Sequence, residues 1–311
     1  MSRVEGVGVA FSGGGFRSFS ELAAVEDMVR NEIHIGAVAG TSMGALVAAL
    51  VAGGLSPQQI EALLIQMDEK IVAEGVLNHM GLKVLNVVAG NNGLINSDIL
   101  YGFARDVLDQ AGIHSFNDFK MPVALPAVDI LSGDLCVFTN DEELFGDPNG
   151  NWVCLSDDLD VARCITASAS YPLAISSTKY RDRIFMDGGC RMNLPTPLFD
   201  RRSVDAVVGV GLRRHMPVQE DLSPLGIAKR TMTCGANQLD KIYSNMADVY
   251  INLPVSGDDA FQAGTGQQVI EEGRLYLQEH PVDWTAARPT GWDAVRRAAT
   301  DLFSRLARPQ Q

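Results

Sequence analysis

Two kinds of hydrophobic pattern alternate along the first part of the chain. Short apolar runs without polar alternation, at 6–11 and 33–39, predict buried strands, whereas 18–30 carries apolar residues at helical spacing on one face. The stretch 45–52 is apolar on every face and predicts a buried helix that ends at a pair of glycines. Strands that alternate with helices and lack a polar face are typical of a parallel sheet covered on both sides.

The alternation continues to about residue 280. The later elements that the pattern predicts are a helix opened by Ser56 and Pro57, helices at 96–111, 157–168, 223–246 and 266–279, and strands at 122–130, 134–139, 183–186, 204–212 and 249–253. We therefore expect an α/β protein, a three-layer α/β/α domain with a central, mostly parallel sheet, over residues 1–285. The remainder, 286–311, is expected to be a tail.

Charge and cysteine content narrow the classes of partner and environment. The 311 residues carry a formal net charge of −13, and 46% of them are hydrophobic, which is enough for a sizeable core. An acidic chain without a basic stripe argues against nucleic acid as a partner. It also argues against electrostatic binding to anionic lipid. Five cysteines without a C-x-x-C spacing, and an N-terminus without a signal peptide, predict reduced thiols and a cytoplasmic location. Nothing in the composition indicates an oligomeric state.

A G-x-S-x-G pentapeptide lies between a predicted strand and the wholly apolar helix. Strand, sharp turn and buried helix form the context of a nucleophile elbow, in which the turn lifts the hydroxyl of Ser42 above the sheet. Gly40 and Gly44 leave room for such a turn. The helix N-terminus, including the Met43 N–H, would offer amides and the positive end of a dipole to a developing oxyanion. The alternative is a tight turn with an incidental serine.

Two further glycine-rich turns follow predicted strands. Residues 13–17 (GGGFR) stand between a strand and a helix, where backbone N–H groups can converge on an anion. A nucleotide site is disfavoured there, because Ser18 occupies the place of the third glycine of a dinucleotide loop and no G-K-[ST] occurs. Residues 187–189 (DGG) place a carboxylate at the end of a strand, although D-G-G alone is an ordinary turn.

Together these motifs resemble the patatin-like phospholipase family over about two-thirds of the chain, up to residue 215. Their order and spacing carry the likeness more than any single motif does. The matching segments are GGGFR at 13–17, GTSMG at 40–44, ASASYP at 167–172, DGG at 187–189 and NLP at 193–195.

The resemblance implies a lipid acyl hydrolase of the phospholipase A or lysophospholipase type that cleaves fatty-acyl esters with a Ser–Asp dyad. Ser42 would be the nucleophile, and Asp187 would take its proton directly, without an intervening histidine. The groups that would hold the oxyanion are those of Gly13, Gly14, Gly15, Phe16, Arg17 and Met43. The positions that would support the motifs are Gly40, Gly44, Gly188, Gly189 and Asn193. The resemblance implies no metal or cofactor.

Several alternatives remain open. His215 follows the strand at 204–212, where the histidine of a conventional Ser–Asp–His esterase or thioesterase could lie, although its polar surroundings favour a solvated loop residue. A non-catalytic lipid-binding regulator with the same fold is a second alternative. Arg17 could contribute charge to the oxyanion site or only an ion pair at the start of a helix.

Two segments could contact lipid. Residues 75–93 are apolar and glycine-rich, with Lys83 as their only charged residue, and they would form either a mobile cap with a peripheral membrane contact or a plain core segment. Residues 292–306 predict an amphipathic helix with arginines off its apolar face. Such a helix either packs against the domain or lies on a membrane.

Overall fold

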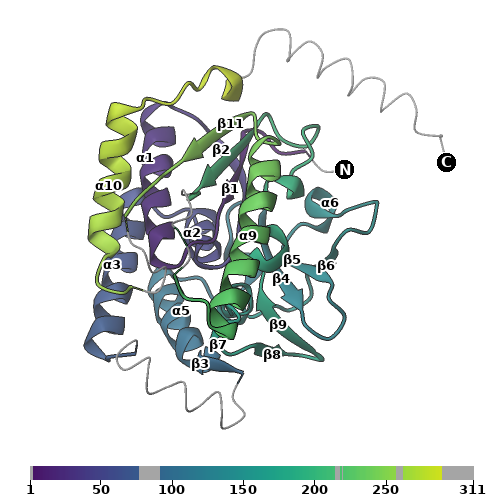
Figure 1. The fold of residues 1–311 in the computed structure, drawn as a ribbon. Coiled ribbons are helices and arrows are strands. Elements are labelled where there is room, and N and C mark those ends of the chain that lie inside the picture. Colours follow the sequence, from purple (N-terminus) through teal and green to yellow (C-terminus); the bar gives the residue numbers. More distant parts are fainter. Residues whose placement is uncertain (1–2, 77–91, 214–217, 219, 257–261, 289–311) are drawn as a thin grey trace, which may run out of the picture.

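The computed structural model describes residues 3–76, 92–213, 218, 220–256 and 262–288, and its centre is a sheet (Figure 1). The strands are β1 Val7–Phe11, β2 Ile35–Gly40, β4 Val123–Asp129, β5 Leu135–Thr139, β6 Val153–Leu155, β8 Thr178–Tyr180, β9 Arg183–Asp187, β10 Val207–Gly211 and β11 Val249–Asn252. They form a nine-stranded sheet of order β11-β10-β1-β2-β4-β5-β6, in which β9 pairs with β4 and with β8. Two short strands, β3 Gly93–Ile95 and β7 Leu173–Ile175, pair separately.

The sheet is mostly parallel, as the sequence predicts. The run β11-β10-β1-β2-β4 is parallel throughout. Antiparallel pairing is confined to the other side of the sheet, where β5 and β9 pair with β4 and β8 pairs with β9. The β4–β5 hairpin closes through Gly133, whose φ of +80° suits glycine best.

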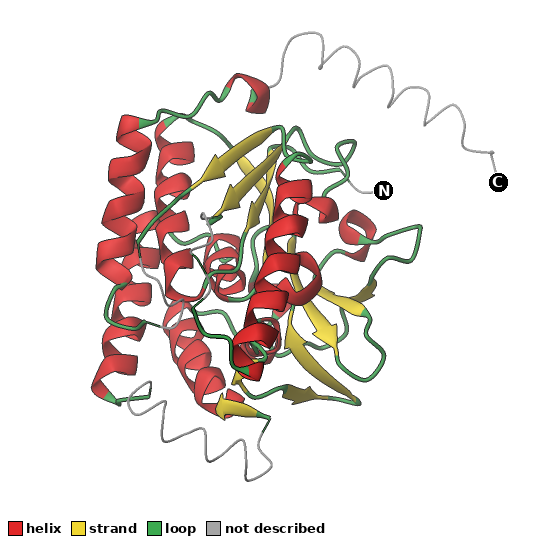
Figure 2. Cartoon of the chain, in the orientation of Figure 1, coloured by secondary structure: helices red, strands yellow, loops and turns green. Residues whose placement is uncertain are grey.

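Helices cover both faces of the sheet (Figure 2). They are α1 Leu22–Arg30, α2 Met43–Ala52, α3 Pro57–Ala73, α5 Ser97–Ala111, α6 Glu142–Phe145, α7 Val161–Ser168, α8 Gly189–Met192, α9 Pro224–Ser244 and α10 Gly266–Glu279. The larger hydrophobic core joins one face of the sheet to α1, α2, α3, α5, α7 and α10. A smaller core lies on the other face, where α6 packs and Tyr243 of α9 contributes. These two cores make the three-layer α/β/α fold that the sequence predicts.

Short-range signals place most helix starts. Ser56 and Gln59 form a capping box before Pro57, the side chain of Asn96 caps α5, and that of Asp160 caps α7. The helix expected at 157–168 therefore begins later than its sequence pattern suggests, at Val161.

The helix expected at 18–30 is replaced in its first part by a 3₁₀ helix, η1 Gly15–Glu21, which leads into α1. The hydroxyl of Ser18 donates to the Ser12 carbonyl, and that of Ser20 donates to the Arg17 carbonyl. Serine hydroxyls that bond to nearby backbone compete with regular α-helical geometry. The other 3₁₀ helices described are η2 Phe116–Asp118, η3 Thr196–Leu198 and η4 Thr285–Ala287.

Some predictions fall on residues that the structure does not describe. Most of the apolar segment at 75–93, the helix at 292–306 and His215 lie outside the described residues.

Before the tail, Trp284 is buried, and its Nε1 donates to Asp27 of α1 at 2.8 Å. Within the described ranges, no helix has both the length and the apolar composition needed to cross a bilayer.

Candidate active site

The turn after β2 holds Ser42 in a strained backbone conformation. Ser42 has φ +56° and ψ −128°, which an L-residue rarely adopts, and it is the N-cap of α2. A side chain at Gly40 would overlap the carbonyl oxygen of Gly44, and a Cβ at Gly44 would lie 2.5 Å from the carbonyl oxygen of Ser12. The two glycines of the pentapeptide are thus required by close backbone contact. The helix that follows, α2, is buried along its whole length.

Asp187, the last residue of β9, is almost completely buried. Its Oδ1 accepts a hydrogen bond from the Gly189 N–H at 2.7 Å. Burial raises the pKa of Asp187 to about 6, whereas the nearby Ser42 side chain and the Gly189 N–H act in the opposite direction as hydrogen-bond donors. The serine and the carboxylate that the sequence singles out therefore lie close together.

The topology of the sheet explains this proximity. Strands β2 and β9 pair with the same edge of β4, since β5 pairs with the other edge over residues 124–128. β2 is parallel to β4 and β9 is antiparallel to it, so their C-terminal ends approach each other. Ala39 pairs with Ala124 and Asp187 pairs with Ala127, which leaves Leu125 and Pro126 of β4 between the two ends. The turn that carries Ser42 and the turn that carries Asp187 meet across this short gap.

Ser168, at the end of α7, bonds to the turn that carries Ser42 and to β4 in the gap between the two turns. Its Oγ accepts the N–H of Ser42 at 2.9 Å and donates to the carbonyl of Pro126 at 2.7 Å. The backbone near it holds the other turn, because the Asp187 N–H donates to the Ser170 carbonyl at 3.0 Å. The sequence predicts no role for Ser168, although its segment, ASASYP, is one of those that carry the family resemblance.

The glycine loop lies beside the nucleophile. A Cβ at Gly13 would lie 2.9 Å from the Cβ of Ser42, so a side chain would crowd the serine. The Gly13 N–H donates to the Asn193 carbonyl at 3.2 Å. Within the described residues, the N–H groups of Gly14, Gly15 and Met43 have no acceptor. Those three amides can receive a new acceptor, whereas that of Gly13 is already bonded.

The remaining loop residues stabilise its shape. Phe16 is buried and packs edge-to-face on Phe19, with ring centroids 5.7 Å apart. The Nε of Arg17 donates to the Gly14 carbonyl at 3.3 Å. Arg17 is thus tied to the backbone of the loop itself.

The D-G-G turn is as crowded as the elbow. A side chain at Gly188 would overlap the Pro126 carbonyl oxygen, and one at Gly189 would lie 2.8 Å from Oδ1 of Asn193. The amide of Asn193 lies between this turn and the glycine loop, because its Nδ2 donates to the Gly13 carbonyl at 3.3 Å. The structure thus brings the five glycine and asparagine positions that the sequence marks as supporting to one place.

The described histidines at 114 and 280 do not extend this site. His114 pairs with Asp109 at the surface, and His280 stacks on Tyr276. Across the described residues, no three His, Cys, Asp or Glu side chains come together in a group that could hold a metal ion.

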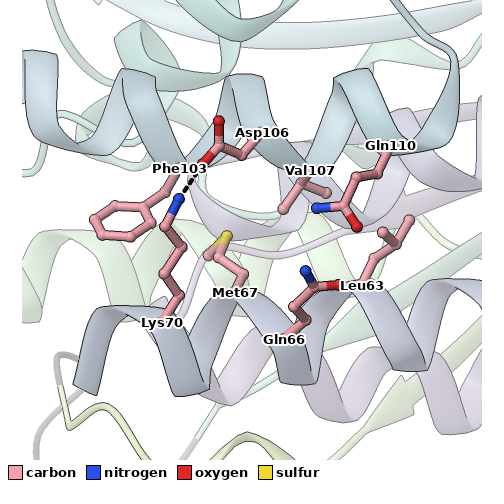
Figure 3. A pocket seen from close by; sticks show the side chains of 8 residues that line it. All are labelled: Leu63, Gln66, Met67, Lys70, Phe103, Asp106, Val107 and Gln110. Carbon is pink, nitrogen blue, oxygen red and sulfur yellow. Dashed lines mark hydrogen bonds and ion pairs between the residues drawn. The ribbon is translucent and has the colours of Figure 1, made fainter. Parts of the chain in front are cut away.

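A small cavity of about 50 Å³ lies elsewhere, between α3 and α5 (Figure 3). Its lining is mainly apolar, and the ion pair of Lys70 with Asp106 spans the two helices beside it. The residues around it are Leu63, Gln66, Met67, Lys70, Phe103, Asp106, Val107 and Gln110. None of them belongs to the predicted site.

The sequence matches one protein family and is similar to proteins from a bacterium and a virus. The sequence model of the family described as "Patatin-like phospholipase" matches residues 9–200. The uncharacterized protein YqhO of Bacillus subtilis (strain 168) is 30% identical over 293 residues, which cover 88% of this chain and 98% of YqhO. The uncharacterized protein R571 of Acanthamoeba polyphaga mimivirus is 22% identical over 214 residues, which cover 67% of this chain and 65% of R571.

Two solved structures are similar over much of the chain. VipD from Legionella pneumophila matches with a TM-score of 0.47 and 12% identity, over 88% of this chain and 66% of VipD. ExoU from the type III secretion system of Pseudomonas aeruginosa matches with a TM-score of 0.40 and 15% identity, over 89% of this chain and 53% of ExoU. The chain therefore spans about two-thirds of one structure and about half of the other.

Proposed function

Because this chain belongs to the patatin-like phospholipase family, and is accordingly a lipid acyl hydrolase, we propose that it cleaves fatty-acyl esters of phospholipids or lysophospholipids with a Ser42–Asp187 dyad. The observation that carries the proposal is the proximity of the Ser42 side chain to the buried Asp187 carboxylate, on whose pKa it acts as a hydrogen-bond donor. No imidazole stands between them among the described residues. A direct Ser–Asp contact suits proton transfer without a histidine.

In the first step, Asp187 accepts the proton of Ser42 while Oγ attacks the acyl carbonyl carbon. The carbonyl oxygen becomes an oxyanion, and the N–H groups of Gly14, Gly15 and Met43 are its proposed donors, since they have no acceptor among the described residues. The tetrahedral intermediate then collapses. The lipid alcohol leaves with the proton from Asp187, and an acyl ester remains on Ser42.

In the second step, water attacks the acyl carbonyl and Asp187 accepts one of its protons. A second oxyanion forms against the same amides, and its collapse releases the fatty acid and returns the proton to the Ser42 oxygen. A pKa of about 6 makes Asp187 a stronger base than an exposed aspartate while leaving it ionised at neutral pH. The scheme uses no calcium or other metal, because an activated serine supplies the nucleophile.

The acidic composition bears on how substrate is reached. With a net charge of −13, the protein has no general attraction to anionic lipid, so we propose that any peripheral membrane contact is apolar.

Fatty-acid release tests the proposal. Wild type, Ser42→Ala and Asp187→Asn are incubated with a mixed phospholipid extract, with and without EDTA, and the released fatty acids and lysolipids are measured by mass spectrometry. Each substitution should lower release on the order of 10³-fold or more, and the double variant little further, because the two groups act as a unit. Unchanged melting temperatures show that the variants remain folded.

Three results would contradict parts of the scheme. Release by Ser42→Ala at the wild-type rate would refute the nucleophile. Loss in His215→Ala as large as in Ser42→Ala would favour a conventional triad. Loss in EDTA that calcium restores would refute the metal-free mechanism.

A further inference from the structure

Helix α9 brings a buried carboxylate to the edge of the site. This helix follows β10 and lies on the face of the sheet opposite α1, α3 and α10 (Figure 1). Asp240 is on its buried side and is only 8% exposed. Its Oδ2 accepts a hydrogen bond from Nδ2 of Asn193 at 2.9 Å. Its Oδ1 has no hydrogen-bond partner within the described residues.

Asn193 connects this carboxylate to the glycine loop. The same Nδ2 that donates to Asp240 also donates to the Gly13 carbonyl at 3.3 Å, and the Gly13 N–H returns a hydrogen bond to the Asn193 carbonyl. The amide oxygen of Asn193 points the other way, toward the Cα atoms of Gly13 and Gly189, where any Cβ would lie within 3 Å of it. The asparagine side chain therefore fills the space between the loop and the turn that carries Asp187.

The orientation of that amide matters, because its two ends are chemically different. If the amide flipped, its oxygen would face the Gly13 carbonyl, which is an acceptor, and the contact would be lost. Asp240, when ionised, is only an acceptor, so it accepts the NH₂ end and disfavours the flipped orientation. No other described contact of the Asn193 side chain makes this distinction as strongly, since the bond to Gly13 is long.

We propose that Asp240 is a positioning residue for the hydrolase: it fixes the amide of Asn193, which in turn holds the Gly13 carbonyl and so sets the position of the loop amides beside Ser42. The proposal rests on the function proposed above, in which those amides bind the oxyanion. It predicts that Asp240 acts on the transition state and hardly on substrate binding.

Burying a carboxylate with one oxygen unpaired lowers the stability of the folded protein. Burial raises the pKa of Asp240 to about 6, against hydrogen bonding from the Asn193 side chain and the Leu194 backbone and against the nearby charge of Arg213. Replacing such a group by an apolar side chain of similar size is often neutral or stabilising. A residue whose role was packing alone would not need a buried carboxylate that lowers the stability of the fold. A residue with a role in the site can carry that loss of stability.

The test compares Asp240→Leu, which removes the acceptor, with Asp240→Asn, whose amide oxygen still accepts from Asn193. Lys241→Ala, at the exposed neighbouring position on α9, is the matched control. The initial rates of p-nitrophenyl butyrate hydrolysis give kcat and KM, and thermal unfolding gives the melting temperature. We expect Asp240→Leu to lower kcat about 10- to 100-fold with KM nearly unchanged and an equal or higher melting temperature. Asp240→Asn should recover most of the lost kcat, and Lys241→Ala should match wild type.

The outcomes separate this proposal from the proposed function. Ser42→Ala, assayed beside them, reports on the function alone. Where Ser42→Ala is inactive, three results would each overturn the role of Asp240. They are a kcat of Asp240→Leu within twofold of wild type, a change confined to KM, or a loss of activity that only follows a lower melting temperature. If Asp240→Leu does not fold, Asp240→Ala takes its place. Asn193→Ala alone must then lower kcat as much as Asn193→Ala combined with Asp240→Ala does.

Discussion

The nucleophile elbow and the glycine loop lie side by side, yet different forces hold them. Backbone packed against backbone holds the elbow, since neither Gly40 nor Gly44 has room for a side chain and α2 behind them is wholly buried. Polar side chains hold the loop. Ser12, before it, donates its N–H and its hydroxyl to the buried Glu21, and Gly13 is tied through Asn193 to Asp240.

The difference concerns what each part must do. A nucleophile needs a fixed position, and steric exclusion supplies it independently of charge. The loop must present amides to a charge that exists only during the reaction, and it depends on two buried carboxyl groups. Burial raises the pKa of both Glu21 and Asp240. The elbow should therefore be most sensitive to added atoms, and the loop to the loss of hydrogen-bond acceptors.

The largest effect is expected for Gly40→Ala. Its Cβ would overlap a backbone oxygen that cannot move without displacing α2, so we expect a loss of about 3 kcal/mol in the free energy of unfolding and no measurable turnover. Urea unfolding and ester hydrolysis measure the two effects. The control is Gly102→Ala in α5, where no atom lies within 4 Å of the added Cβ and stability should rise by up to about 1 kcal/mol. Equal stability of the two variants would disprove the steric account of the elbow.

Ser168→Ala tests a polar side-chain contact of the elbow, the one with the Ser42 N–H. It removes the acceptor of the Ser42 N–H and the donor to the Pro126 carbonyl, so both are left buried. We expect a loss of about 1–3 kcal/mol in the free energy of unfolding and a fall in kcat of about 100-fold. Ser170→Ala is the control, because its hydroxyl bonds to the Thr166 carbonyl and Thr178 instead of either turn. Similar kcat losses in both variants would show that Ser168 has no special role.

Gly14→Ala should act on the loop without unfolding the protein. Gly14 has φ −172°, which any residue adopts, and the one close contact of its Cβ would be with the Leu212 Cδ1, at 2.5 Å, the end of a flexible side chain. We expect kcat to fall about 10-fold as the loop amide shifts, with KM nearly constant. Adding Leu212→Ala should restore part of the loss. A change in KM alone would make the loop a substrate-binding element.

The smallest effect is expected on stability as a function of pH. Glu21, Asp187 and Asp240 all have a raised pKa in the folded protein, so the folded state binds more protons than the unfolded one above about pH 4. The contribution of these three groups to stability should therefore fall as the pH rises from 4 through 6. Asp240→Asn should remove a part of that fall on the order of 1–3 kcal/mol, because its side chain carries no charge. Chemical unfolding at pH 4.5 and 7.5 measures it, and an unchanged pH dependence in the variant would contradict this picture.

What the sequence could predict follows the same division. The elbow and the order of strands and helices are encoded locally, by glycine spacing and apolar runs, whereas the pairing of Ser42 with Asp187 was implied by the family resemblance. The antiparallel entry of β9 against β4, which brings the pair together, depends on long-range pairing that no local pattern shows. The same is true of Ser168 and Asp240, because each contacts its partner across at least 40 residues of chain. The helix expected at 18–30 was wrong in its first part because serine hydroxyls compete for the backbone there.

The central claim is that Asp187 activates Ser42 directly, and the rate at which a fluorophosphonate probe labels the protein tests it most simply. The position of the label is identified by mass spectrometry of the digested protein. The account predicts one label, on Ser42, at a rate that falls at least about 100-fold in Asp187→Asn and stays unchanged in His215→Ala. Labelling of Asp187→Asn at the wild-type rate, or its loss in His215→Ala, would contradict the account.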